Sequence, residues 1–253
     1  MPPADLDKFL LVKVGTLPVV VSAPHGGKLL LPGVPDRTGE GVEQFVTVRD
    51  VNTDQIAERW AAACEEPLGG RPFLVVARFS RRQLDANRPA AGAYESDAAR
   101  PYYDAYHAAL RKHCEAVRTG WGRGLVVDVH GQGAKADTVF RGTARLTSLK
   151  LLRDRFGDKA VTGPDSLLGA PATRGATVFP PVGGPADAAE HPRFGGGHIT
   201  RTYGAAGDTG LDAVQLEFGG QYSAAAALDR TAGDLATALA RFHKAYLPAE
   251  RLP

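Results

Sequence analysis

Residues 125–133 read Leu-Val-Val-Asp-Val-His-Gly-Gln-Gly, an apolar, β-branched run that ends in an acid and a histidine and then enters a glycine-flanked turn. This pattern is typical of a buried parallel strand. In open α/β sheets, ligands bind just beyond the carboxyl ends of such strands. We therefore expect His130 to lie at a functional site.

Two other stretches of the chain have the same form. Residues 18–27 (PVVVSAPHGG) end in His25 beside two glycines, and residues 213–220 (AVQLEFGG) end in Glu217. In each of these three apolar strands, one ionisable group stands next to a glycine-rich turn. This arrangement indicates a functional site. Our working hypothesis from this pattern is a metal-dependent hydrolase.

Strand and helix patterns alternate along the chain. Strands are predicted at 9–15, 18–23, 73–77, 125–130, 139–142, 177–179, 198–203 and 213–218, and helices at 50–64, 98–119, 146–156 and 223–246. This alternation predicts a three-layer α/β/α fold with a mixed, mostly parallel central sheet. No internal repeat or linker divides residues 1–253, so we expect a single α/β hydrolase domain.

Composition narrows the class of protein. The 30 Lys and Arg against 28 Asp and Glu give a net charge of +2 without a dominant basic cluster, which argues against nucleic acid or an anionic membrane as the main partner. No apolar run approaches the roughly 20 residues that span a bilayer, and residues 1–13 lack the features of a signal peptide. Cys64 and Cys114 are expected to be reduced core thiols, which suits a cytoplasmic protein.

Three of the seven histidines are candidate functional residues. His25 and His130 each end an apolar strand next to glycine, a setting that suits metal ligation or catalysis. His198 follows three glycines and is a candidate for substrate binding. The other four lie in helical or loop patterns, where packing or surface roles are expected.

A zinc site is consistent with these histidines. Catalytic zinc typically takes three protein ligands, often two histidines and one carboxylate, and keeps one position for water. Candidate carboxylates are Asp50 and Asp54 at a predicted helix start, and Asp128 on the same strand face as His130. Asp50 could instead cap the helix, and Asp128 could orient the imidazole rather than bind metal. We expect one Zn²⁺ per chain.

Glu217 is the candidate catalytic group. A buried, unpaired glutamate is costly, so a function or a partner is needed to explain it. Near a metal-activated water it could act as general base and then as proton donor to a leaving nitrogen. The alternative is a buried ion pair with an arginine.

A dense polar segment, residues 80–89, follows the strand at 73–77. Arg81, Arg82 and Arg88 could each bind a carboxylate through the planar guanidinium fork, and Asn87 could hold the same group. A solvated charged loop is the alternative.

In chain order, these motifs resemble the N-formylglutamate amidohydrolase family. The motifs are residues 24–27 (PHGG), Asp50 with Asp54, residues 80–88, Asp128 with His130, and Glu217. The resemblance covers about residues 18–222. It implies a phosphorylase/hydrolase-like α/β fold similar to that of the zinc carboxypeptidases.

The resemblance also implies roles for individual residues. His25 and His130 would be zinc ligands, Asn87 and Arg88 would hold a substrate carboxylate, and Glu217 would be the catalytic glutamate. The implied reaction is hydrolysis of an amide, from an N-acyl, for example N-formyl, acidic amino acid or a small peptide.

One position departs from the carboxypeptidase pattern. Those enzymes carry a glutamate three residues after the first histidine, whereas this chain has Lys28 there. The third ligand must come from elsewhere, and we favour Asp50, then Asp54. Segments 131–133, 140–143 and 195–198 have no place in the formylglutamate-specific pattern, so the substrate itself is left open.

Three hypotheses follow. The first is the zinc amidohydrolase described above. The second is a non-catalytic binding protein for a carboxylate-bearing metabolite, which would use Arg81, Arg82 and Arg88. The third is a metal-free hydrolase with Ser22 or Ser80 as nucleophile, which the lack of a G-x-S-x-G elbow disfavours.

Overall fold

A seven-stranded sheet forms the centre of the computed structural model, which describes residues 5–252. Its strand order is β1-β3-β2-β4-β7-β5-β6. The strands are β1 (Leu10–Lys13), β2 (Val19–Ala23), β3 (Phe73–Ala77), β4 (Leu125–Gln132), β5 (Thr138–Gly142), β6 (Thr177–Phe179) and β7 (Asp212–Gly219). Only the β1–β3 and β5–β7 pairings are antiparallel, which confirms the predicted mixed, mostly parallel sheet.

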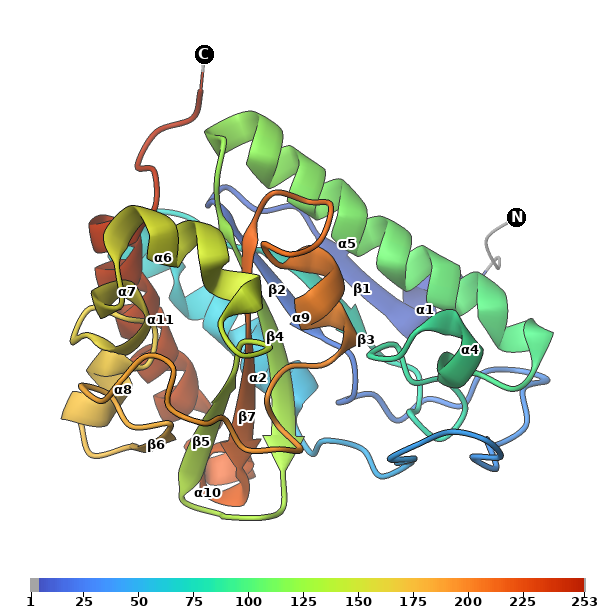
Figure 1. Ribbon diagram of the computed structural model, residues 1–253. Helices are drawn as coiled ribbons and strands as arrows, with labels where there is room; N and C mark the ends of the chain where they lie inside the picture. Colours follow the sequence, from blue (N-terminus) through green and yellow to red (C-terminus); the bar gives the residue numbers. More distant parts are fainter. Residues whose placement is uncertain (1–4, 253) are drawn as a thin grey trace.

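Helices cover both faces of the sheet (Figure 1). The long α5 (Arg100–Trp121) and the short α9 (His198–Tyr203) lie on one face, and α2 (Thr53–Ala63) and α11 (Leu228–Tyr246) lie on the other. The shorter helices are α1 (Leu6–Phe9), α3 (Glu65–Leu68), α4 (Ala90–Ala93), α6 (Lys150–Phe156), α7 (Lys159–Thr162), α8 (Gly169–Thr173) and α10 (Gly220–Ser223). The three-layer prediction is confirmed. Within residues 5–252, no helix combines the length and apolar character needed to cross a membrane.

Strand alternation decides which side chains face the candidate site. On β4, Val127 and Val129 join the core beneath α2 and α11, whereas Val126 joins the core beneath α5. Because side chains in a strand alternate between faces, Asp128 and His130 share the α5 face with Val126. The carboxyl end of β4 thus carries an acid and a histidine on one face of the sheet.

Helix α5 forms because its apolar residues recur at helical spacing. Tyr102, Tyr106, Leu110 and Val117 are all buried against the sheet. The helix ends at Gly122, whose φ of +73° is the left-handed conformation that glycine adopts at no steric cost. This face therefore rests on a long rigid element.

The predicted thiol state is confirmed. Cys64 and Cys114 are both free and buried. Burial raises the pKa of each thiol to about 12, so neither is a reactive thiolate at neutral pH.

One local prediction was wrong, and one alternative that the sequence left open is not found. Residues 198–203, predicted as a strand because of their β-branched side chains, form helix α9, in which Ile199 and Tyr203 lie one turn apart and pack into the α5-side core. Asp50 does not cap a helix. Helix α2 begins at Thr53, and the Asp50 carboxylate turns toward β4 instead.

An unusual turn follows β5. Residues 144–146 have φ values of +49°, +56° and +68°, a conformation that costs an L-residue roughly 1–2 kcal/mol. The Glu190 carboxylate accepts hydrogen bonds from the backbone N–H of Thr143 (2.7 Å) and of Arg145 (3.1 Å). The N–H of residue 144 donates to Gly195 O (2.7 Å). The left-handed turn is therefore fastened to the Pro/Gly-rich loop of residues 181–197.

Candidate active site

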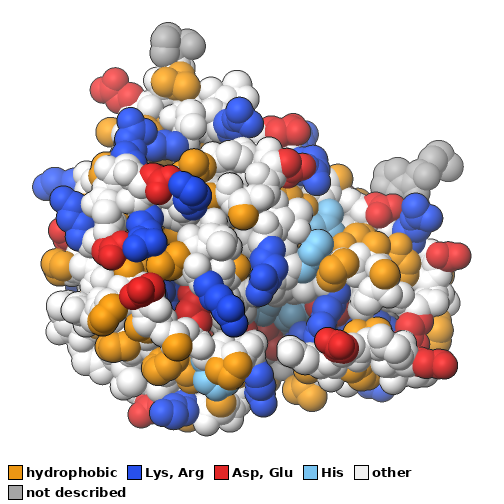
Figure 2. Space-filling view, in the orientation of Figure 1, with side chains coloured by type: hydrophobic (Ala, Val, Ile, Leu, Met, Phe, Trp, Pro, Cys, Tyr) orange, Lys and Arg blue, Asp and Glu red, His pale blue; other side chains and the backbone are white. Residues whose placement is uncertain are grey.

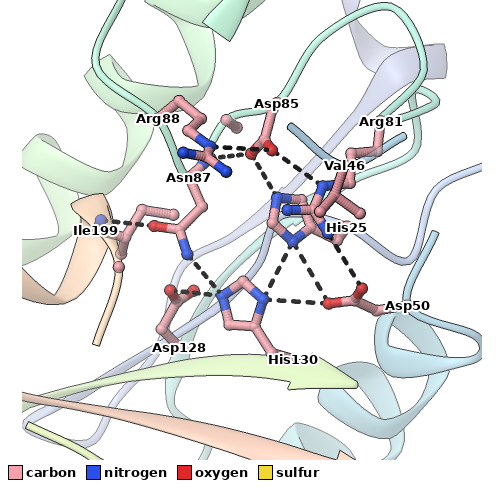
Figure 3. A network of polar contacts seen from close by, with 12 residues as sticks. His25, Val46, Asp50, Arg81, Asp85, Asn87, Arg88, Asp128, His130 and Ile199 are labelled. Atoms are coloured by element: carbon pink, nitrogen blue, oxygen red, sulfur yellow. Dashed lines mark hydrogen bonds and ion pairs between the residues drawn. The ribbon is translucent and has the colours of Figure 1, made fainter. Parts of the chain in front are cut away.

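Three side chains converge at the carboxyl ends of β2 and β4 (Figure 3). His25 Nδ1 lies 3.1 Å from His130 Nδ1 and 3.4 Å from Asp50 Oδ2, and His130 Nδ1 lies 3.1 Å from that same oxygen. A tetrahedral zinc ion with bonds of about 2.0–2.1 Å holds its ligand atoms about 3.3 Å apart. The triangle therefore fits a zinc-sized cation. Within residues 5–252, no other group of histidine, cysteine and acidic side chains is arranged in this way.

Backbone contacts fix Asp50 in this triangle. Its N–H donates to His25 O (3.1 Å), and its Oδ2 accepts from the Gly131 N–H (3.1 Å). Burial raises the pKa of Asp50, but hydrogen bonds from His130 and His25 outweigh burial and hold that pKa well below its usual range. Asp50 is therefore an ionised carboxylate held against both imidazoles.

Each imidazole is supported from behind by a buried carboxylate. His25 Nε2 lies 2.6 Å from Asp85 Oδ1, and His130 Nε2 lies 2.8 Å from Asp128 Oδ2. A carboxylate at Nε2 holds a proton on that nitrogen and leaves Nδ1 as the nitrogen that faces the centre and can bind a metal, as in the carboxylate–histidine–metal arrangement. Asp128 thus lies behind His130 and outside the triangle.

Asp85 belongs to the polar segment 80–89, but no role of its own was predicted for it. Arg81 Nε donates to its Oδ2 (2.9 Å), and Arg88 Nε and Arg37 Nη2 lie 3.7 and 4.0 Å from that oxygen. Burial raises the pKa of Asp85, but the charges of His25 and Arg81 lower it well below its usual value. Nothing in segment 80–89 distinguishes this acid, since its contact with His25 spans 60 residues of sequence.

Asn87 and Arg88, predicted to bind substrate, line the cleft but already have partners. Asn87 Oδ1 accepts from the Ile199 N–H (2.8 Å), and its Nδ2 lies 3.0 Å from His130 Nε2. Arg88 donates to the backbone oxygens of residues 43 and 44. Their assignment to a substrate carboxylate stays a prediction.

Asp54, the second choice for the third ligand, lies outside the triangle. Its Oδ2 is 3.5 Å from Arg78 Nη1, and its backbone packs so closely on Gly26 that a Cβ at Gly26 would clash with it. Of the two candidate acids at this helix start, the structure therefore brings only Asp50 to the histidines.

The two candidate nucleophilic serines are buried, and their hydroxyl groups already have hydrogen-bond partners within the fold. Ser22 is completely buried, donates its hydroxyl to Asp128 Oδ1 (2.9 Å) and lies 2.8 Å from Tyr106 Oη. Ser80 is buried as well, and its Oγ accepts from the Arg82 N–H (3.3 Å). Neither hydroxyl is presented to a substrate, so the serine hypothesis is not supported.

Glu217 lies directly beside the triangle. It is the cross-strand partner of His130 in the parallel β4–β7 pair and lines the cleft. Burial raises its pKa to about 8. Gln215 donates its Nε2–H to Glu217 Oε1 (2.9 Å) and accepts at Oε1 from the Gly197 N–H (2.7 Å). Among residues 5–252, no arginine or lysine nitrogen lies within 4.0 Å of the Glu217 carboxylate, so the ion-pair alternative is not found.

The triangle and Glu217 open into a cleft of about 1130 Å³. Residues 44–46 and 48–51 line part of it, and residues 192–198 with Arg201 line another part. Figure 2 shows Lys and Arg side chains gathered around the hollow in which histidine is visible. His198, a predicted substrate-binding residue, lines this cleft, and burial lowers its pKa, so that it is neutral at pH 7.

Three arginines that sequence reasoning missed also line the cleft. Arg49, Arg193 and Arg201 have no carboxylate oxygen within 4.0 Å in the described part of the chain. Arg201 Nε donates to Gly196 O (3.2 Å), and Arg193 lies over the Phe194 ring. Their positive charges are therefore available to an anionic ligand. Arg49 and Arg193 lie in loops and Arg201 lies in helix α9, and nothing in their sequence surroundings separates them from other surface arginines.

Fold and site together define an α/β protein with a candidate metal centre at the carboxyl ends of its parallel strands. No protein-family model matches the sequence, and no curated protein matches it. Among solved structures, the chain is similar to N-formylglutamate amidohydrolase from Ralstonia eutropha JMP134, with a TM-score of 0.64, 15% identity, and coverage of 94% of this chain and 98% of that one. It is also similar to a gene product from Agrobacterium tumefaciens, with a TM-score of 0.61, 15% identity, and coverage of 96% and 98%. The predicted resemblance is confirmed at the level of the fold.

Proposed function

We propose that this chain is a zinc-dependent amidohydrolase that cleaves the amide bond of an N-acyl acidic amino acid or a small peptide. The observation that carries the proposal is the triangle of His25 Nδ1, His130 Nδ1 and Asp50 Oδ2, in which a buried carboxylate supports each imidazole. Two histidines and one carboxylate, open to a cleft, are the donor set of many hydrolytic zinc sites.

His25, His130 and Asp50 would hold the metal. When bound there, a zinc ion would polarise an amide carbonyl, lower the pKa of a water molecule and favour the ionised form of Glu217. Asp85 and Asp128 keep the Nε2 protons of the two histidines in place and so fix the direction of both Nδ1 lone pairs.

Glu217 would move the proton. Its carboxylate lies beside His130 in a desolvated position, with Oε1 held by Gln215. In this geometry Glu217 takes a proton from the attacking water and delivers it to the leaving nitrogen. A pKa of about 8 before metal binding indicates that the site stabilises the protonated form, which is the form that serves as the acid.

Charge in the cleft supports an anionic substrate. Arg49, Arg193 and Arg201 line the cleft without a carboxylate partner in residues 5–252, and a guanidinium binds a carboxylate through two parallel hydrogen bonds. The fold neighbour from Ralstonia eutropha is, by its name, an amidohydrolase of N-formylglutamate, which supports the same reaction class. A small-molecule substrate and a cytoplasmic location, the latter suggested by the two free cysteines, complete the proposal.

The test combines metal content with turnover. Wild-type protein is expected to bind about one zinc per chain and to hydrolyse members of a panel of N-acyl amino acids, with loss of turnover in Glu217→Gln. Asp50→Ala is expected to lose zinc, whereas Asp54→Ala, the matched control four residues further along the chain, is expected to retain it.

Two results would contradict the proposal. Undiminished hydrolysis by folded, metal-free protein would show that zinc is not required. Binding of a carboxylate ligand that survives a chelator, with no turnover across the panel, would favour the non-catalytic binding protein.

A further inference from the structure

Three exposed valines line one stretch of the cleft. Val46, Val48 and Val51 are 38%, 73% and 50% exposed. A single exposed valine is ordinary on a protein surface. Three within six residues, all lining the cleft that holds the candidate metal centre, form an apolar surface that a ligand can cover. We call these residues the valine strip.

Two buried or half-buried arginines hold the strip in place. Arg37 Nη2 donates to Val46 O (2.9 Å) and to Arg81 O (2.8 Å). Arg88 Nη1 donates to the backbone oxygen of Glu43 (3.0 Å), and its Nη2 bonds residue 44. Because these bonds fix the backbone just before Val48, a ligand on the strip would not have to order a loop first.

The strip lies within reach of the reacting centre. Val51 follows Asp50 directly and Val48 precedes it by two residues, so the Cα atoms of both lie within about 8 Å of that of Asp50, given 3.8 Å between consecutive Cα atoms. A group of several carbons attached to an amide carbonyl at the triangle would therefore reach the valines. A one-carbon formyl group would not.

The size of the cleft also favours an acyl group larger than formyl. Its volume of about 1130 Å³ lies just above the range of roughly 300–1,000 Å³ that is usual for sites of drug-sized ligands. An N-formyl amino acid is much smaller than such ligands and would leave the valine strip in water.

We propose that the acyl half of the substrate is an apolar group of several carbons, such as a hexanoyl or benzoyl group, which packs on the valine strip. This inference rests on the proposed amidohydrolase function. Hydrolysis would add one water across the C–N bond and release the apolar carboxylic acid and the free amino acid. The free arginines of the cleft would bind the carboxylate of the amino-acid half.

The experiment compares four substrates that share one amino acid, N-formyl-, N-acetyl-, N-hexanoyl- and N-benzoyl-L-glutamate. The variants are Val48→Ser and Val46→Ser, which add no charge beside Asp50. Val14→Ser is the control, because Val14 is 79% exposed but does not line the cleft. For wild-type protein we expect kcat/KM to rise at least about tenfold from formyl to hexanoyl or benzoyl. We expect Val48→Ser to remove most of that rise and Val14→Ser to preserve it.

Binding is measured in parallel by calorimetry with the same four compounds and the Glu217→Gln protein, which separates the inference from the proposed function. If the long acyl compounds bind more tightly and Val48→Ser abolishes the preference, the apolar site stands even when no compound is hydrolysed. If formyl and hexanoyl compounds bind and react equally, the inference is overturned while the hydrolase remains. A change in oligomeric state in Val48→Ser without a change in acyl preference would overturn it as well, because the strip would then cover a second copy of the chain.

Discussion

Replacing Glu217 with glutamine should stabilise the metal-free protein, and the gain should grow with pH. Glu217 is 7% exposed, and burial raises its pKa from 4.5 to about 8. Between these two pH values the unfolded chain has released the proton while the folded chain still holds it. Stability from this group is therefore complete below pH 4.5 and is lost as the pH rises toward 8. The Glu217→Gln variant keeps this stability as the pH rises, because glutamine has the same shape and stays neutral.

The magnitude follows from the pKa difference. Each pH unit between the two pKa values removes about 1.4 kcal/mol from the free energy of unfolding of the wild-type protein. The Glu217→Gln variant should therefore match wild type to within about 0.5 kcal/mol at pH 4.5, exceed it by about 3 kcal/mol at pH 7, and exceed it by about 5 kcal/mol above pH 8.

Urea unfolding in the presence of a chelator, at pH 4.5, 7 and 8.5, measures these differences. The matched control is Glu66→Gln, at an exposed glutamate, which should differ little from wild type at any of these pH values. A stability difference between Glu217→Gln and wild type that stays constant across the three pH values would refute the reasoning, because the carboxyl group would then ionise alike in the folded and unfolded chains.

Three further predictions concern the support of the site and the core. Ser22→Ala removes the hydroxyl that donates to Asp128, and should weaken zinc binding about tenfold in a chelator competition; an unchanged affinity would rule out a positioning role. Gly142→Ala would push a Cβ into the glycine-rich cleft loop and should lower the free energy of unfolding by about 1–3 kcal/mol, whereas Gly133→Ala, which faces open space, should not. Trp60→Ala empties a fully buried position beneath the sheet and should cost about 3–5 kcal/mol in urea unfolding, and a smaller loss would mean that the core collapses into the space.

The central strands and their histidines could be predicted from sequence because their signals are local. Apolar β-branched runs specify β2, β4 and β7, and the parallel order brings their carboxyl ends to one edge of the sheet. His25, His130 and Glu217 each stand at such an end, so their proximity followed from strand geometry alone. Asp50 could be selected only because it stands at the start of the next helix.

The remaining parts of the site depend on contacts that local patterns do not encode. Asp85 meets His25 through a loop whose path is set by hydrogen bonds distant in sequence, including the one from Arg37 to Arg81 O. Helix α9 was mistaken for a strand because Ile199 and Thr200 favour extended structure, while packing against the α5 side of the sheet decides its actual conformation. For both Asp85 and helix α9, contacts between residues distant in sequence decide the structure.

The left-handed turn at residues 144–146 does not line the cleft, but it is hydrogen-bonded to the Pro/Gly-rich loop, part of which does. Glu190 and Gly195, both in the Pro/Gly-rich loop, hold this turn through three backbone N–H groups. If the loop moved away, the turn would lose the bonds that offset its conformational cost and would relax toward right-handed geometry. Amide hydrogen exchange at residues 143–145 should therefore slow whenever a ligand orders the loop, which makes occupancy of the cleft detectable at backbone groups that no ligand touches.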